Sequence, residues 1–147
     1  MYRSIVVGTD GSDTAAEAVR QATELAKSVG AQVYLVSAYT PVSDTRLRQE
    51  RQDAPEEIQW SINPREDVEE TLRLAAEKVT EGGAQVETFA REGNPADAIL
   101  DVAEEKNADL VIVGNRGMTG ASRFLLGSVP NKISHHSPSS VLIIRTT

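Results

Sequence analysis

The sequence predicts an α/β fold, a three-layer α/β/α sandwich built on a five-stranded parallel sheet of order 3-2-1-4-5. Five short apolar runs rich in β-branched residues alternate with four amphipathic helical patterns along 147 residues. Such alternation is typical of parallel strands joined by right-handed helical crossovers. Only the third run carries alternating polar residues, which places it at a sheet edge and favours this order over 2-1-3-4-5. The length corresponds to one domain spanning residues 1–147.

The predicted strands are the runs SIVVG (4–8), QVYLVSAY (32–39), QVETFA (85–90), DLVIVG (109–114) and SVLIIR (140–145). Four of them are apolar on successive residues, as expected for strands that are covered on both faces. The exception is the third, in which polar and apolar side chains alternate. We therefore expect that strand to bury one face only.

The first two helices carry start and stop signals. The first begins with a cap at Ser12 or Asp13 and stops at Gly30. The second has Asn63 as its cap and ends at the glycine pair 82–83. The side chains expected to face the sheet are Ala15, Ala18, Val19, Ala22, Leu25, Ala26 and Val29 in the first helix, and Val68, Leu72, Ala75 and Val79 in the second.

The last two helices are shorter. The third has Asn94 as its cap and Pro95 at its first position, and the fourth begins at Ser128. The side chains expected to face the sheet are Ile99, Val102 and Ala103 in the third helix, and Val129 and Ile133 in the fourth.

Composition excludes several classes of protein. The net charge is −7, which argues against nucleic-acid binding through bulk charge, and the chain has no cysteine for a disulfide scaffold or a thiolate metal site. The apolar stretch before Gly8 is too short for a signal peptide, and no run approaches the length of a membrane span. We therefore expect a cytoplasmic protein with no membrane or nucleic-acid partner.

The connection over residues 41–64 is far longer than the roughly two to six residues usual between a strand and a helix. It is rich in charge and carries the chain's only tryptophan, Trp60. Because it follows the second strand, we interpret it as a mobile flap beside a binding site. A solvated linker with a short helical turn is the alternative.

The predicted strand order brings the ends of the first and fourth strands together, where open α/β sheets bind ligands. The first strand ends in GTDGS (8–12) and the fourth in GNRG (114–117). Asp10 offers a carboxylate to a ribose, although an acidic residue here also suits a simple turn. Gly117 allows a positive φ or a close approach to a ligand.

The fourth helix is a predicted anion site. Its start, at Gly127 and Ser128, offers backbone N–H groups of residues 127–129 and a serine hydroxyl to phosphate oxygens, although Ser128 can also act only as a helix cap. Arg116, Arg123 and Lys132 lie close in sequence and predict a positively charged mouth.

The spacing Gly114-x2-Gly117-x9-Gly127-Ser128 resembles the G-2x-G-9x-G-[S/T] signature of ATP-binding proteins in the universal stress protein (UspA-like) family. The stretches IVVGTDGS (5–12) and FLLGSVPNKI (124–133) resemble the same family, and the resemblance covers the whole chain. It implies a Rossmann-like fold of the adenine nucleotide alpha hydrolase type. One departure is PSS at 138–140, where many members have Pro-Cys-Pro.

The resemblance also assigns roles by position, with adenine nucleotide as the ligand. Asp10 would meet the ribose and the Ala38 backbone the adenine, while Val113 and Gly114 would line the floor. The whole implied set of cofactor-binding residues is Gly8, Thr9, Asp10, Ala38, Val113, Gly114, Arg116, Gly117, Gly127, Ser128 and Val129, of which Gly117, Gly127, Ser128 and Val129 would hold the phosphates.

The resemblance implies a non-enzymatic stress-response sensor or nucleotide reservoir that binds ATP, with or without Mg²⁺. Cyclic AMP is the alternative ligand, and a slow ATPase or nucleotide-dependent phosphotransferase is the alternative activity. Residues 114–128 contain no Asp or Glu to act as a base or a Mg²⁺ ligand, and the chain has no Walker A pattern. A metal site at the adjacent His135 and His136 is not expected, since neighbouring helix positions point apart.

A phosphoacceptor receiver domain is disfavoured, because the third strand ends in FARE and the fifth in IIRTT, without the acid and lysine it needs. A dimerisation adaptor with an empty pocket would be expected to have lost the glycines. The fifth strand is an unprotected sheet edge and predicts a homodimer in which two copies pair through Val141, Leu142, Ile143 and Ile144.

Overall fold

The computed structural model describes residues 1–39, 65–115 and 127–146. These ranges form five parallel strands, β1 (Ser4–Gly8), β2 (Gln32–Tyr39), β3 (Gln85–Glu92), β4 (Leu110–Gly114) and β5 (Ser140–Ile144). The sheet order is β3-β2-β1-β4-β5, which confirms the predicted topology with the polar strand at one edge. The connection over residues 41–64, with Trp60, lies outside the described residues.

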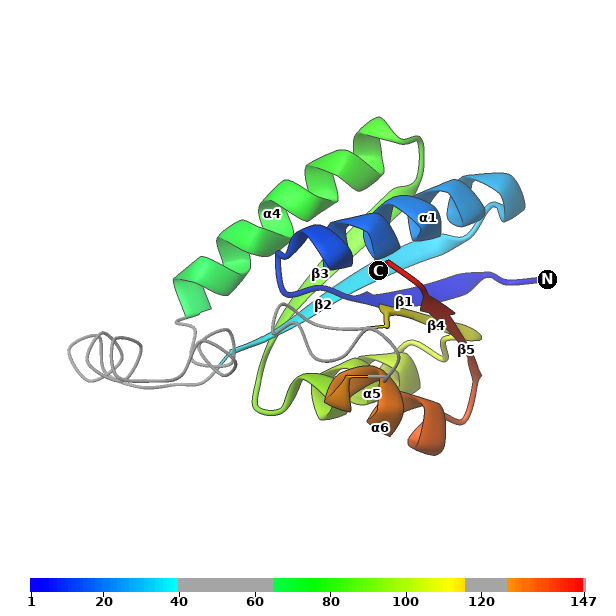
Figure 1. Ribbon diagram of the computed structural model, residues 1–147. Coiled ribbons are helices and arrows are strands. Elements are labelled where there is room, and N and C mark those ends of the chain that lie inside the picture. The colour runs from blue at the N-terminus through cyan, green and yellow to red at the C-terminus, as the bar shows by residue number, and fades with distance from the viewer. Residues whose placement is uncertain (40–64, 116–126, 147) are drawn as a thin grey trace.

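Four helices cover the two faces of this sheet, as Figure 1 shows. Helices α1 (Asp13–Val29) and α4 (Arg65–Glu81) lie on one side, and α5 (Pro95–Glu105) and α6 (Ser128–His136) on the other. This is the predicted three-layer sandwich. No helix in the three described ranges is long and apolar enough to cross a membrane.

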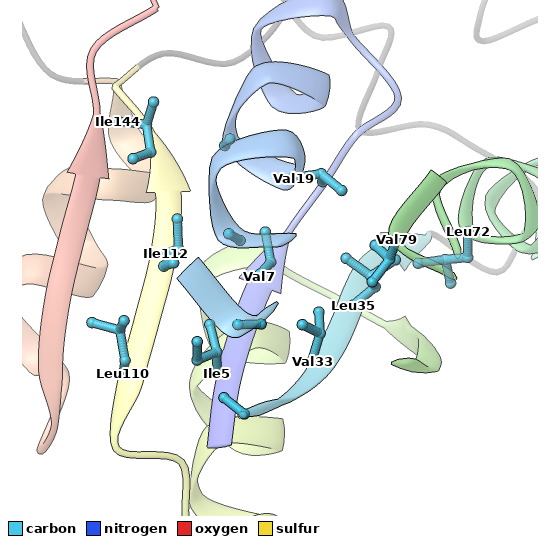
Figure 2. Close-up of a cluster of buried hydrophobic side chains, with 14 of the residues drawn as sticks. Ile5, Val7, Val19, Val33, Leu35, Leu72, Val79, Leu110, Ile112 and Ile144 are labelled. Atoms are coloured by element: carbon cyan, nitrogen blue, oxygen red, sulfur yellow. The ribbon is translucent and has the colours of Figure 1, made fainter. Parts of the chain in front are cut away.

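The core has two parts because successive strand residues point to opposite faces. In β1, Ile5 and Val7 pack with α1 and α4, whereas Val6 packs with α5 and α6. Figure 2 shows the first part, in which side chains of the sheet meet Val19 of α1 and Leu72 of α4. Every strand except β3 contributes a fully or nearly fully buried side chain, and the central strand β1 lies between β2 and β4.

The helix caps confirm the local signals. Ser12 accepts a hydrogen bond from the Ala15 amide at 3.2 Å, and Gly30 ends α1 in the left-handed region at φ 73°. Asn94 accepts from the amides of residues 96 and 97 at the start of α5. The predicted cap of α4, Asn63, lies outside the described residues.

One side-chain prediction for α1 is wrong, and one buried residue of the helix lies outside the predicted stripe. Val29 is 38% exposed, whereas Thr23 is buried and donates its hydroxyl to the Val19 carbonyl at 2.8 Å. Val29 is the last residue of α1, and its apolar side chain lies partly in solvent and not against the sheet. Thr23 satisfies its hydroxyl within the helix and is therefore buried without cost in hydrogen bonding.

The prediction that the fifth strand is covered on both faces is also wrong. Leu142 is 40% exposed, and of this strand only Ile144 is buried. The cause is the position of the helices, since α1 packs on β1 and β4, one strand short of β5, while α6 packs on the opposite side. Among the described residues the edge strand therefore presents apolar side chains to solvent.

Candidate functional site

A cavity of about 100 Å³ opens at the carboxyl edge of the sheet, where β1 and β4 lie side by side. This is where the strand order reverses and where the sequence predicts a ligand site. The volume is smaller than the roughly 300–1,000 Å³ of complete ligand pockets. Residues 40–64 and 116–126 follow β2 and β4 in the sequence and lie outside the described residues.

Most of the predicted site residues meet at this cavity. The lining includes Gly8, Thr9, Asp10, Ala38, Val113, Gly114 and Val129. Gly127 and Ser128 lie beside Val129 at the start of α6 but are not part of the lining. Arg116 and Gly117 lie outside the described residues.

The turn after β1 holds Asp10 in place through local hydrogen bonds. The Thr9 amide donates to the Val36 carbonyl at 3.0 Å, which ties the turn to the end of β2. One carboxylate oxygen of Asp10 accepts from the Ser12 amide at 2.9 Å. Gly11 has φ 83°, a left-handed conformation that lets the chain reverse into α1. The turn thus fixes the Asp10 carboxylate at the cavity.

Gly8 brings the end of β1 against α5. A Cβ atom built on Gly8 would lie 2.4 Å from Cδ1 of Ile99, well inside van der Waals contact. The missing side chain lets Ile99 pack directly on the strand end, where both residues line the cavity. The floor of the site is therefore built by backbone on one side and an aliphatic side chain on the other.

The cavity has one polar and one apolar wall. The more polar wall lies on the α1 and α4 side, where Ser37, Asp67 and Thr71 join Asp10 beside the apolar Ala15 and Val68. The apolar wall lies on the α5 and α6 side and consists of Pro95, Ile99, Val113, Val129 and Pro130. Such a cavity suits a flat, mostly apolar ring attached to a hydroxyl-bearing group.

Sequence reasoning missed the contributions of α4 and α5 to these walls. Pro95 and Ile99 were assigned to a helix but not to the site, and Ser37, Asp67 and Thr71 were not singled out. One feature of the sequence could have shown this. Both helices follow strands whose carboxyl ends lie at the edge with the cavity, so the first turns of the helices lie over that edge.

The start of α6 provides fewer free amides than predicted. Gly127 donates its N–H to the Asn115 carbonyl at 2.9 Å, and the Asn131 amide bonds to the Gly127 carbonyl at 3.1 Å. Pro130 has no N–H. The amides of Ser128 and Val129 have no partner among the described residues, and these two remain for an anion. Gly127 has φ −65° and ψ 169°, which any residue adopts, so backbone strain does not require glycine there. The predicted reason that remains is a close approach of the ligand to the backbone.

The predicted positive mouth receives no support from Lys132, which forms an ion pair with Asp97 at 2.8 Å. Arg116 and Arg123 lie outside the described residues. Among the described lining residues there are two carboxylates, Asp10 and Asp67, and no lysine or arginine. In the described ranges no three His, Cys, Asp or Glu side chains come together as a metal site.

The resolved pKa shifts lie away from this cavity, on the exposed faces of α1 and α4. The hydrogen bond from Arg20, with a second one from Gln21, lowers the pKa of the Glu17 carboxyl to about 2. Arg73 likewise lowers the pKa of Glu70 by a hydrogen bond. These ion pairs are exposed to solvent, and none of their residues lines the cavity.

Comparison with known proteins gives one consistent result. A family model described as "Universal stress protein family" matches residues 1–145. Universal stress protein Rv1636 of Mycobacterium tuberculosis is 36% identical over 148 residues, which cover 99% of this chain and 98% of that protein.

Two solved structures share the fold and carry adenine nucleotides. A universal stress protein in complex with cAMP is 32% identical with a TM-score of 0.75, and the match covers 99% of this chain and 98% of the other. The universal stress protein from Archaeoglobus fulgidus in complex with dAMP is 27% identical with a TM-score of 0.67, covering 97% and 98%.

Proposed function

We propose that this chain binds an adenine nucleotide, and the premise is its family: it belongs to the universal stress proteins. The observation that carries the proposal is the cavity at the ends of β1 and β4. Asp10 of the IVVGTDGS stretch and Gly114, the first glycine of the family-like spacing, line the same space there. Relatives in complex with cAMP and dAMP support an adenine nucleotide as the ligand class.

The two walls suggest how the nucleotide lies. Adenine fits the apolar wall, with its edge toward the backbone of Ala38 and its face over Val113 and Ile99. The ribose lies toward the Asp10 carboxylate, and the phosphates lie toward Gly117, Gly127 and the free amides of residues 128 and 129.

ATP is the favoured ligand because the glycine spacing resembles that of ATP-binding members, and cyclic AMP is the alternative because a relative carries it. The ligand also implies a cytoplasmic location, where adenine nucleotides are made. Mass spectrometry of gently purified protein, after release of the ligand by denaturation, tests the choice. We expect ATP or cyclic AMP in the released fraction, and a different class of metabolite there would contradict the proposal.

We propose a sensor or reservoir and not an enzyme. No acidic residue occurs between Gly114 and Ser128 to position water or Mg²⁺ at the phosphates, so turnover should be absent or very slow. Phosphate release from saturating ATP and Mg²⁺ measures this directly. A rate near about 1 s⁻¹ that disappears in Gly127→Ala would instead establish a slow ATPase.

Replacement of Asp10 tests the ribose contact. Asp10→Ala is expected to weaken ATP binding about tenfold or more, because hydrogen bonds to a charged carboxylate are among the stronger ones. Asp10→Asn is the matched control, since it keeps the acceptor that the Ser12 amide uses at 2.9 Å and so preserves the turn. The ligand control is 2′,3′-dideoxy-ATP, which Asp10→Ala should bind nearly as well as the unmodified protein. Equal weakening of both ligands would place Asp10 away from the ribose.

We also propose that the chain forms a homodimer through β5. Leu142 is 40% exposed on an edge strand whose neighbouring residues, Val141 and Ile143, are only half-buried. The same strand of a second copy, antiparallel about a two-fold axis, would cover these side chains and satisfy the open backbone groups of both edges.

A further inference from the structure

Asn115 joins three parts of the chain by hydrogen bonds. Its amide donates to the Ile144 carbonyl at the end of β5, and its carbonyl accepts from the Gly127 amide before α6, both at 2.9 Å. Its side-chain Oδ1 accepts from the Thr146 amide at 2.9 Å and from the Thr146 hydroxyl at 3.0 Å. One residue thus connects β4, the chain after β5 and the start of α6.

Asn115 is only 5% exposed, one of three buried polar residues in the described ranges. It follows Gly114, which lines the cavity, but is not itself part of the lining. The nucleotide roles proposed above leave this side chain without a function. A buried amide that accepts two hydrogen bonds at one oxygen fixes its own orientation and that of its partners.

These bonds place the start of α6 relative to the sheet. Gly127 is held to Asn115 by one backbone hydrogen bond, and Asn115 is held to the end of β5 by its amide and its side chain. The amides of Ser128 and Val129, which have no described partner, follow Gly127 directly. A small rotation at Asn115 would therefore change the direction in which those two amides point.

We propose that Asn115 is a positioning residue for the phosphate end of the site, and that it couples Thr146 to nucleotide binding. The inference rests on the proposed function and deepens it, since it names a control point of the same site. Coupling between two sites is reciprocal: if the Thr146 contact favours the bound state, then bound nucleotide stabilises the Thr146 contact by the same factor.

Three substitutions separate this role from a purely structural one. Asn115→Ala removes the acceptor of Thr146 but keeps both backbone hydrogen bonds of residue 115. Thr146→Val removes only the hydroxyl donor, and Thr146→Ser keeps it as the matched control. We expect Asn115→Ala to weaken ATP binding about fivefold or more and Thr146→Val about twofold or more, with Thr146→Ser unchanged.

The experiment combines calorimetric titration with ATP, thermal unfolding and hydrogen exchange of the Thr146 amide. The proposal expects lower affinity in both loss variants and slower exchange at Thr146 when ATP is added to the unmodified chain. A lower unfolding temperature with unchanged affinity and unchanged exchange would overturn it, leaving Asn115 a structural residue. If Asn115→Ala does not fold, Thr146→Val decides by the same measures. Absence of ATP and cyclic AMP binding by the unmodified chain would overturn both the proposed function and this inference.

Discussion

Alanine at both Gly114 and Gly127 is expected to abolish adenine-nucleotide binding and leave the chain folded. Neither glycine has a positive φ, so alanine brings no backbone strain at either position. Gly114 lines the cavity at the end of β4, and Gly127 precedes the two amides at the start of α6 that have no partner among the described residues. On the proposed arrangement, a Cβ atom at Gly127 would enter the space of the phosphates, and one at Gly114 would narrow the floor beneath the nucleotide.

Calorimetric titration measures the loss, and circular dichroism with thermal unfolding checks the fold. Gly30→Ala is the matched control, because its φ of 73° disfavours alanine while a Cβ there meets nothing within 4 Å. It should lower stability by about 1 kcal/mol and keep full binding. The double variant should therefore lose binding and keep its stability, whereas Gly30→Ala should keep binding and lose stability. Unchanged affinity in a folded double variant would remove these glycines from the site.

Arginine at Leu142 is expected to convert the proposed dimer to a monomer. The unmodified chain should scatter light as a species of about twice 15.9 kDa. Leu142 is 40% exposed on β5, where no described helix covers it, so a second copy gains by burying it. Because 40% of each Leu142 side chain remains to be buried, the two copies together lose burial worth about 1–2.5 kcal/mol, which raises the dissociation constant about tenfold to fiftyfold.

The matched control is Leu74→Arg, the same change at a leucine that is 49% exposed on α4. It should leave the dimer intact. A second disruption, Ile143→Pro, removes a backbone donor from the edge strand and should act in the same direction. A monomeric unmodified chain at tens of micromolar, or equal dissociation by both arginine variants, would exclude β5 as the interface.

The sheet order was predictable because one strand differs from the rest. Polar and apolar residues alternate in QVETFA, so that strand had to lie at an edge, and the crossover rule then fixed the neighbours of β1. The caps were equally local: Ser12 and Asn94 act on amides two or three residues away. Signals of this kind lie within one turn and need no knowledge of tertiary contacts.

The features of the site that the sequence did not predict depend on contacts between residues distant in the chain. Thr71 and Pro95 line the cavity because α4 and α5 both begin at the same sheet edge, and no local pattern shows how far each helix extends over it. Asn115 resembles an ordinary turn residue until Thr146, 31 residues later, is seen to contact it. Lys132 is near the site in sequence but pairs with Asp97 on another helix. Sequence patterns therefore predicted which strand ends form the site better than they predicted which side chains from other elements line it.

The central claim is that this chain holds one adenine nucleotide at the ends of β1 and β4. Calorimetric titration of the unmodified protein with ATP and with cyclic AMP, with GTP as the control, tests it most directly. We expect saturable binding of at least one adenine nucleotide at one site per chain. We expect weaker binding of GTP, since the described residues of the apolar wall beside Ala38 offer no polar side chain for the guanine edge. A chain that binds neither ATP nor cyclic AMP at millimolar concentration, while remaining folded, would contradict the account.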